Sequence, residues 1–176
     1  DLETARQCEV DVVFAPTYQQ IYPDNYRYRV QENDLSRVLC GAHRPGHFDG
    51  VLSVVLKLFQ LIQPQKVYFG EKDFQQLKLI TGLVESFFLN LEVVPVPTVR
   101  DSDGLALSSR NARLTDEQRK KAPLLFKALT EKKSLPEAWG FLEQQGFKID
   151  YLEDRWGRRF VAAFLEDVRL IDNVPL

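Results

Sequence analysis

The spacing of apolar residues predicts alternating strands and helices in the first half of the chain. Residues 66–69 form a short apolar run, and residues 91–96 form another. Between them, over residues 74–88, one face of a helical pattern carries Phe74, Leu77, Ile80, Val84 and Phe87. A strand, a helix and a second strand at this spacing are typical of a parallel α/β sheet with a right-handed crossover.

Three earlier segments extend this pattern. Residues 51–62 carry the broad apolar stripe of a core helix, which Pro64 ends. Residues 10–15 fit a short buried strand that Pro16 ends. Residues 26–30 fit a short edge strand. These segments predict that the sheet begins before residue 66.

The second half of the chain predicts a different architecture. Two prolines and the run Asp-Ser-Asp-Gly mark residues 95–104 as a strand end, a turn and a domain boundary. Thr115 and Gln118 form a capping box that opens a helix. A second helix is expected from about residue 135 to Gln145, with Gly146 as its C-terminal cap. Three strands are then expected, at residues 149–153, 160–164 and 168–171. This order predicts a small α+β domain, separate from the parallel sheet.

Composition describes an ordinary globular chain of 176 residues, with 44% hydrophobic and 27% charged residues. The net charge of −2 gives no electrostatic footprint for nucleic acid or an anionic membrane. Cys8 and Cys40 form no metal-ligand or disulfide pattern, which favours a reducing cytosol and packed rather than reactive thiols. Because the chain contains no methionine, we expect it to lack a retained initiator and to be an incomplete form of a longer protein.

Candidate chemistry begins at Gly70-Glu71-Lys72-Asp73, where the first strand gives way to a helix. Gly70 would allow close backbone approach to a ligand or a positive φ. Lys72 places an ammonium group beside a helix N-terminus, which favours anions such as phosphate. Asp73 would cap the helix, with Gln76 completing a capping box. The stretch therefore supports either a solvated helix cap or a phosphate site at the carboxyl end of a strand.

A second polar cluster, Leu107-Ser108-Ser109-Arg110-Asn111, follows the boundary segment. Alone, this composition is typical of a structural loop. Paired with the first cluster across a domain boundary, its hydroxyls and forked cation favour an anion site. His43 and His47 have the spacing of a helical metal site, but the Pro-Gly pair between them interrupts any helix, so no metal ligands are assigned.

Four motifs together carry a resemblance to a known family. They are GAHRPGHFDGV at 41–51, FGEKDFQQ at 69–76, VPTVRDSDGLALSSRN at 96–111 and RLIDN at 169–173. In this order they closely resemble the pantothenate synthetases, the ATP-dependent pantoate–β-alanine ligases, over nearly the whole chain. The family's His-x-Gly-His nucleotide-binding motif occurs nowhere in this sequence.

The resemblance implies an α/β fold, with an incomplete Rossmann-like parallel sheet over residues 1–98 and a small α+β lid-like domain over residues 99–176. It implies ATP-dependent condensation of pantoate with β-alanine through a pantoyl adenylate. It also implies use of Mg²⁺ and a cytoplasmic homodimer. From the net charge, no nucleic-acid or membrane partner is expected. Without the missing motif, residues 1–176 alone are expected to be inactive.

The resemblance also assigns residues. It gives a catalytic role to Lys72, Ser108, Ser109 and Arg110. It places ATP against these four and against Gly70, Glu71, Asp73, Val99 and Leu107, and it places pantoate against Gln76. Arg44 and His47 would support the substrate pocket. Members of the family often carry Glu where this chain has Cys40, which puts an ion pair with Arg44 in doubt.

Two rival interpretations stay open. The chain could belong to another adenylate-forming nucleotidyltransferase that activates a different acid, since Gln76 discriminates only weakly between hydroxy acids. Alternatively, it could be a non-catalytic binding fragment, because half of the family's nucleotide site is absent. Substrate profiling would separate the first rival, and an upstream His-x-Gly-His segment in the reading frame would exclude the second.

Overall fold

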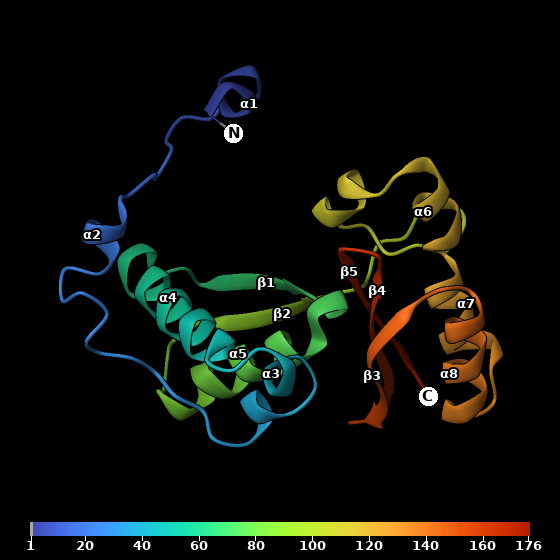
Figure 1. The fold of residues 1–176 in the computed structure, drawn as a ribbon. Coiled ribbons are helices and arrows are strands. Elements are labelled where there is room, and N and C mark those ends of the chain that lie inside the picture. Colours follow the sequence, from blue (N-terminus) through green and yellow to red (C-terminus); the bar gives the residue numbers. More distant parts are fainter. Residues whose placement is uncertain (1) are drawn as a thin grey trace.

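The computed structural model describes residues 2–176, which form two lobes joined by a linker over residues 97–108 (Figure 1). A parallel pair of strands organises the first lobe, and an antiparallel three-stranded sheet organises the second. The elements, in chain order, are α1 (Leu2–Gln7), α2 (Tyr18–Ile21), the 3₁₀ turn η1 (Leu35–Arg37), α3 (Cys40–His43), α4 (His47–Ile62), β1 (Lys66–Gly70), η2 (Glu71–Asp73), α5 (Phe74–Ser86), β2 (Glu92–Val96), η3 (Ser109–Arg113), α6 (Asp116–Lys121), α7 (Leu124–Glu131), α8 (Leu135–Gln144), β3 (Lys148–Arg155), β4 (Arg158–Leu165) and β5 (Val168–Pro175).

In the first lobe, β1 and β2 pair in parallel, as the strand–helix–strand pattern predicts. Helices α4 and α5 pack on one face of this pair through the buried side chains of Phe48, Leu52, Phe59, Leu79, Ile80, Leu83 and Val84. Val67 and Phe69 of β1 pack against that cluster, whereas Tyr68, which alternates to the other face, is 66% exposed. The core therefore lies between the helices and one face of the strands.

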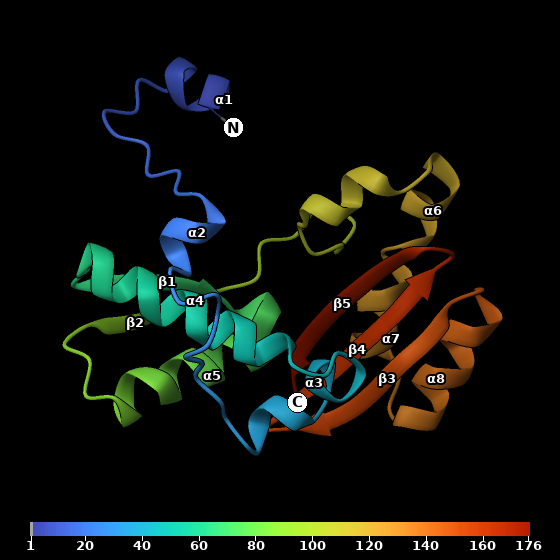
Figure 2. The same cartoon turned by 60° about the vertical axis from the view of Figure 1, so that its left-hand side comes forward.

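In the second lobe, β3, β4 and β5 form an antiparallel meander, with both faces covered. Helices α7 and α8 cover one face (Figure 2), through a cluster that includes Leu125, Leu129, Leu142, Val161 and Val168. The opposite face, which carries Tyr151 and Phe160, packs against Leu39 and Phe74 of the first lobe. The sheet is therefore the surface on which the two lobes meet, and the predicted α+β architecture is confirmed.

Local sequence sets the helix boundaries of the second lobe. The hydroxyl of Thr115 accepts a hydrogen bond from the backbone N–H of Gln118, whose side chain accepts from the backbone N–H of Thr115, so the predicted capping box is present. Ser134 caps α8 in a similar way, because its hydroxyl oxygen accepts a hydrogen bond from the backbone N–H of Glu137. Gly146, with φ +88°, lies just beyond the end of α8, where left-handed backbone favours glycine.

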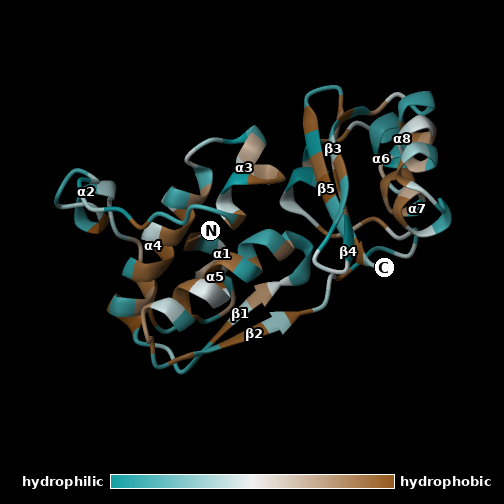
Figure 3. Ribbon diagram, turned by 90° about the horizontal axis from the view of Figure 1, so that it is seen from below, coloured by the Kyte–Doolittle hydropathy of each residue, from teal (hydrophilic) through white to brown (hydrophobic). Residues whose placement is uncertain are grey.

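Two predicted strands do not form. Residues 10–15 run as an extended arm away from the lobes (Figure 1), and the side chain of Val12 is 82% exposed. No strand of the described residues 2–176 pairs with this segment, so its apolar pattern alone cannot make it a strand. Residues 26–30 form no strand either: a turn over residues 23–26 leads into irregular backbone, and the Asp24 carboxylate accepts a hydrogen bond from the backbone N–H of Tyr28 at 2.8 Å. In Figure 3, hydrophilic residues lie around the neighbouring α2, whereas hydrophobic residues lie along the strands β1 and β5.

The start of α5 also differs from the prediction. Asp73 makes no capping hydrogen bond, because η2 runs directly into α5 and holds Asp73 at φ −99°, ψ 53°, away from the extended geometry of a cap. Gly70 has φ −69°, so it supplies no left-handed turn. The space where a Gly70 side chain would lie is open, which keeps close approach by a ligand possible.

Candidate active site

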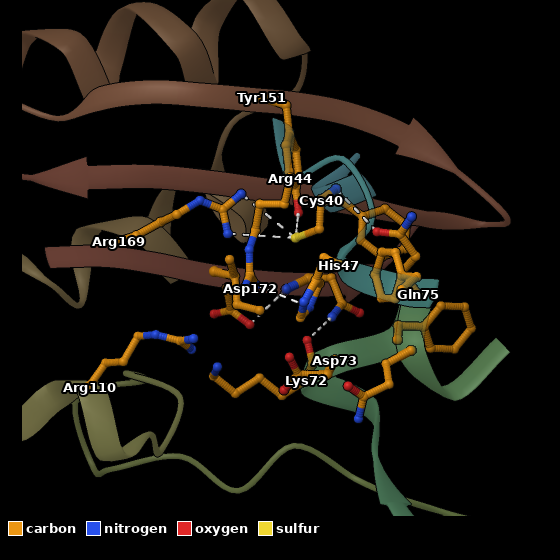
Figure 4. Close-up of a pocket in the computed structure, with 16 residues that line it drawn as sticks. Cys40, Arg44, His47, Lys72, Asp73, Gln75, Arg110, Tyr151, Arg169 and Asp172 are labelled. Carbon is orange, nitrogen blue, oxygen red and sulfur yellow. Dashed lines mark hydrogen bonds between the residues drawn. The ribbon is translucent and has the colours of Figure 1, made fainter. Parts of the chain in front are cut away.

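A narrow cavity of about 50 Å³ lies where the two lobes meet (Figure 4). Its walls come from the α3–α4 loop, the turn before α5, η3 and the strands β3, β4 and β5. The side chains singled out in the sequence that line it are Arg44, His47, Lys72, Asp73, Gln76 and Arg110. A smaller adjoining cavity adds Ser108, and Lys72 and Arg110 line both spaces. Segments that are far apart in the sequence therefore bring these groups to one place.

Lys72 and Arg110 are the two cations that face each other across this space (Figure 4). Lys72 extends from η2 in the first lobe, and Arg110 extends from η3 beyond the linker. Within residues 2–176, neither side chain makes an ion pair or a hydrogen bond. The carboxylates of Asp73 and Asp172 also line the cavity, but neither pairs with these two cations, and Asp172 pairs with Arg100 instead. Because two unpaired like charges face each other, the arrangement favours an anion between them.

His47 lies beside these cations as a neutral imidazole. Nη1 of Arg44 lies 3.1 Å from Nε2 of His47. Because a guanidinium can only donate, Nε2 must accept, which leaves the proton on Nδ1. Burial lowers the pKa of His47 below its ordinary value, and the surrounding cations lower the pKa further: Arg44, Arg110 and Arg169.

Adjacent glutamines on α5 have different environments. Gln75 is buried, and its amide donates to the carbonyl oxygens of Leu35 at 2.6 Å and Val38 at 2.8 Å. Its side-chain oxygen accepts from the backbone N–H of Cys40 at 3.1 Å. Gln75 therefore ties α5 to the segment before α3. Gln76 is partly exposed and lines the cavity, so its amide is available to a ligand.

Cys40 belongs to a polar network that sequence reasoning missed (Figure 4). Its Sγ lies 3.1 Å from the hydroxyl of Tyr151, and the guanidinium of Arg169 donates to the same sulfur at 3.6 and 3.7 Å. Arg169 also pairs with Asp150, with an N–O distance of 2.6 Å, and His43 approaches the other carboxylate oxygen at 2.6 Å. Burial raises the pKa of Tyr151, and Cys40 raises that pKa further, so the phenol stays protonated.

In the structure, Cys40 and Arg44 have different partners. Arg44 forms no ion pair among residues 2–176, and its side-chain hydrogen bond goes to His47 instead. Cys40 contacts Arg169 and Tyr151, which lie on β5 and β3. The available signal for Arg169 was its place in the Arg-Leu-Ile-Asp-Asn motif, which received no role from the sequence. Tyr151 gave no local signal, because an aromatic residue on a strand is typical of a core.

The remaining residues assigned to ATP do not line the cavity. Val99 and Leu107 are exposed by 62% and 48%, and the backbone N–H of Leu107 donates to the carbonyl of Val99 at 2.9 Å, so they lie side by side. Gly70 and Ser109 are exposed. Glu71 turns away from the cavity and forms an ion pair with Arg158 at 3.5 Å.

Two further findings hold for residues 2–176. Their His, Cys, Asp and Glu side chains form no group of three or more that could hold a metal ion. No helix among them has both the length and the apolar character needed to cross a membrane.

Comparison with known proteins places this geometry in a family. The sequence matches the family described as pantoate-beta-alanine ligase over residues 1–175. The chain belongs to this family. A pantothenate synthetase of Bdellovibrio bacteriovorus is 64% identical over 176 residues, which is all of this chain and 70% of that protein. One from Legionella pneumophila is 49% identical over the same shares.

Solved structures agree with the assignment. A pantoate-beta-alanine ligase from Francisella tularensis, described as complexed with beta-gamma ATP and beta-alanine, superposes with a TM-score of 0.91 at 39% identity, covering 99% of this chain and 68% of that one. A pantothenate synthetase from Thermus thermophilus gives a TM-score of 0.85 at 42% identity, covering 99% and 74%. The fold of this chain is thus the mixed α/β fold of the family.

Proposed function

We propose that this protein condenses pantoate with β-alanine at the expense of ATP, through a pantoyl adenylate. The observation that carries the proposal is the pair of unpartnered cations, Lys72 and Arg110, facing one cavity from two lobes. Membership of the family and the ATP and β-alanine bound to the Francisella tularensis relative support this assignment.

In the proposed first step, a pantoate carboxylate oxygen attacks the α-phosphorus of ATP, and the bond to pyrophosphate breaks. Negative charge develops on the phosphate oxygens, so cations already in place lower the barrier. Lys72 supplies a compact charge and Arg110 a bidentate fork. The hydroxyls of Ser108 and Ser109 would donate to the same oxygens.

The remaining groups would orient the substrates. Gln76 would hold pantoate through its amide, and Asp73, which is exposed and free of a capping role, would accept from the ribose hydroxyls. The backbone near Gly70 and the exposed pair Val99 and Leu107 would border the rest of the nucleotide.

In the proposed second step, the free amine of β-alanine attacks the acyl carbonyl carbon of the adenylate. The C–N bond forms, the bond between acyl carbon and phosphate oxygen breaks, and AMP leaves with that oxygen. The amine must lose a proton. Neutral His47, whose orientation is fixed by Arg44, would support the pocket without adding a competing charge.

A cavity of about 50 Å³ is far smaller than the roughly 300–1,000 Å³ of ordinary ligand sites. We therefore propose that residues 1–98 and residues 99–176 act as separate domains, which move apart to admit ATP and close over it. Since residues 2–176 offer no cluster of metal ligands, Mg²⁺ would be held mainly by phosphate oxygens and water. When bound, Mg²⁺ would neutralise phosphate charge.

Three parts of the proposal rest on the family resemblance. They are a homodimer, a cytoplasmic location, and the inactivity of residues 1–176 expressed alone. The last follows because phosphate-binding histidines of a His-x-Gly-His motif are absent from this sequence.

The test is pantoate-dependent exchange of labelled pyrophosphate into ATP by the protein as its gene encodes it, with β-alanine left out. Lys72→Ala should lower the exchange rate by about 10²–10³ because one charge-stabilising group is lost. Lys66→Ala is the matched control, since Lys66 pairs with Glu92 at the far end of β1. Exchange with another acid but not pantoate would favour the rival nucleotidyltransferase, and no exchange with any acid would favour a binding module.

A further inference from the structure

One buried side chain joins the second lobe to the turn that carries Lys72. Asn173, near the end of β5, is 2% exposed. Its Nδ2 donates to the carbonyl oxygens of Glu71 at 2.9 Å and Lys72 at 3.0 Å. Its Oδ1 accepts from Nε of Arg158 at 2.5 Å. Both amide protons and the amide oxygen are therefore engaged in contacts that no other residue type of this size could reproduce.

Arg158 holds the same turn from a second side. Its guanidinium pairs with the Glu71 carboxylate at 3.5 Å and lies 4.6 Å from the centre of the Phe74 ring. Asn173 thus holds the backbone carbonyl groups of Glu71 and Lys72. Arg158 holds the side chains of Glu71 and Phe74, which lie on either side of Lys72 in the sequence. Within residues 2–176, the side chain of Lys72 itself makes no hydrogen bond or ion pair, so the backbone alone determines where it begins.

The neighbouring residue anchors Asn173. Asp172 accepts a hydrogen bond from the backbone N–H of Asn173 at 2.8 Å. Its carboxylate also accepts from both terminal nitrogens of Arg100, at 2.6 and 2.9 Å. The end of β5 is therefore tied to the linker as well as to the turn, and the place of the Asn173 amide is determined by the second lobe.

We propose that Asn173 is a positioning residue, which fixes the position of Lys72 in the cavity when the second lobe packs against the first. Its amide bonds form between the lobes, so Lys72 and Arg110 face the same anion only while β5 lies against the turn. A shift of about 1 Å in a charge-stabilising group costs on the order of 10²-fold in rate. The inference rests on the proposed role of Lys72.

The experiment measures pantoate-dependent pyrophosphate exchange in the enzyme as its gene encodes it. Asn173→Ala removes both donors and should lower the exchange rate by about 10- to 100-fold. Asn173→Asp should lose at least as much, since a carboxylate offers no donor and repels two carbonyl oxygens. Asn173→Ser keeps one donor and should retain more activity than Asn173→Ala. Val174→Ala, at the next position of β5 and also buried, should lower the melting temperature but leave exchange unchanged.

A double mutant separates positioning from a general structural effect. If Asn173 acts through Lys72, adding Asn173→Ala to Lys72→Ala should cause no further loss, because the coupled groups are non-additive. If the losses of exchange rate from the two substitutions multiply in the double mutant, and the variants still unfold cooperatively, the proposal is overturned. Wild-type exchange in Asn173→Ala alongside inactive Lys72→Ala would overturn it too, and would leave the proposed function standing. Absence of exchange in the wild type would instead refute the proposed function.

Discussion

Replacing Arg110 should separate catalysis from stability. Its side chain is exposed and makes no ion pair or side-chain hydrogen bond within residues 2–176, and only its backbone N–H is used, in donating to the Ser108 hydroxyl at 3.2 Å. Arg110→Ala should therefore change the free energy of unfolding by no more than about 0.5 kcal/mol. The loss of one charge-stabilising group should raise the activation free energy by about 2.7–4 kcal/mol, which is about 10²–10³ in rate.

Arg110→Lys refines the magnitude. Lysine keeps the charge but loses the fork, so one of two charge-assisted hydrogen bonds to phosphate is lost. A hydrogen bond to a charged group is worth about 1.5–3 kcal/mol, which predicts a loss of at least about tenfold in kcat. ATP affinity should change little, because Arg110 reaches the phosphates only when the lobes close.

The assay is AMP release with pantoate, β-alanine, ATP and Mg²⁺, run as full kcat and KM determinations beside thermal unfolding. Arg113→Ala is the matched control: it lies one turn further along η3, outside the cavity, and pairs with Asp167 at the surface. Its turnover should be unchanged. Wild-type turnover in Arg110→Ala would show that the Ser-Ser-Arg loop is structural.

Three other predictions follow from the same geometry. Because the folded pKa of His47 lies below its ordinary value of 6.5, stability from this group is present above pH 6.5 and is lost as pH falls toward the folded pKa. NMR titration should therefore show a pKa below 6.5 that rises when ATP binds beside it, and no rise would place the phosphates elsewhere. Arg100→Leu strands the buried Asp172 carboxylate and should cost about 3–5 kcal/mol in urea unfolding, partly recovered by adding Asp172→Asn; a cost under about 1 kcal/mol would contradict the burial of this pair. Residues 1–176 expressed alone should release no AMP, whereas multiple turnovers would show that their own groups suffice.

Local signals predicted much of the fold. The capping box at Thr115 and the glycine after α8 fix helix ends through bonds made within a few residues, so sequence alone reveals them. The prediction of a strand at residues 10–15 was wrong because a strand needs a partner, and an apolar pattern does not show whether one exists. The prediction that Asp73 caps α5 was wrong because a 3₁₀ turn continues directly into that helix.

Some site residues could likewise be predicted from local sequence, and others could not. Lys72 and Arg110 stand in compact motifs with recognisable chemistry, so the sequence indicated them. Tyr151 and Asn173 act through contacts with residues about one hundred positions away, which no local pattern records. The sequence also could not show that Gln75 ties helix to loop while Gln76 faces the cavity, since adjacent residues differ only in the side of the helix they occupy.

The most direct test of the adenylate pathway follows one oxygen atom. Pantoate labelled with oxygen-18 in its carboxylate is incubated with ATP, β-alanine, Mg²⁺ and the enzyme as its gene encodes it, and the products are separated by mass. Attack of the carboxylate on the α-phosphorus, followed by cleavage at the acyl carbon, transfers one labelled oxygen to AMP. The adenylate pathway predicts labelled AMP and unlabelled pyrophosphate. Formation of ADP and labelled inorganic phosphate, with no labelled AMP, would contradict it.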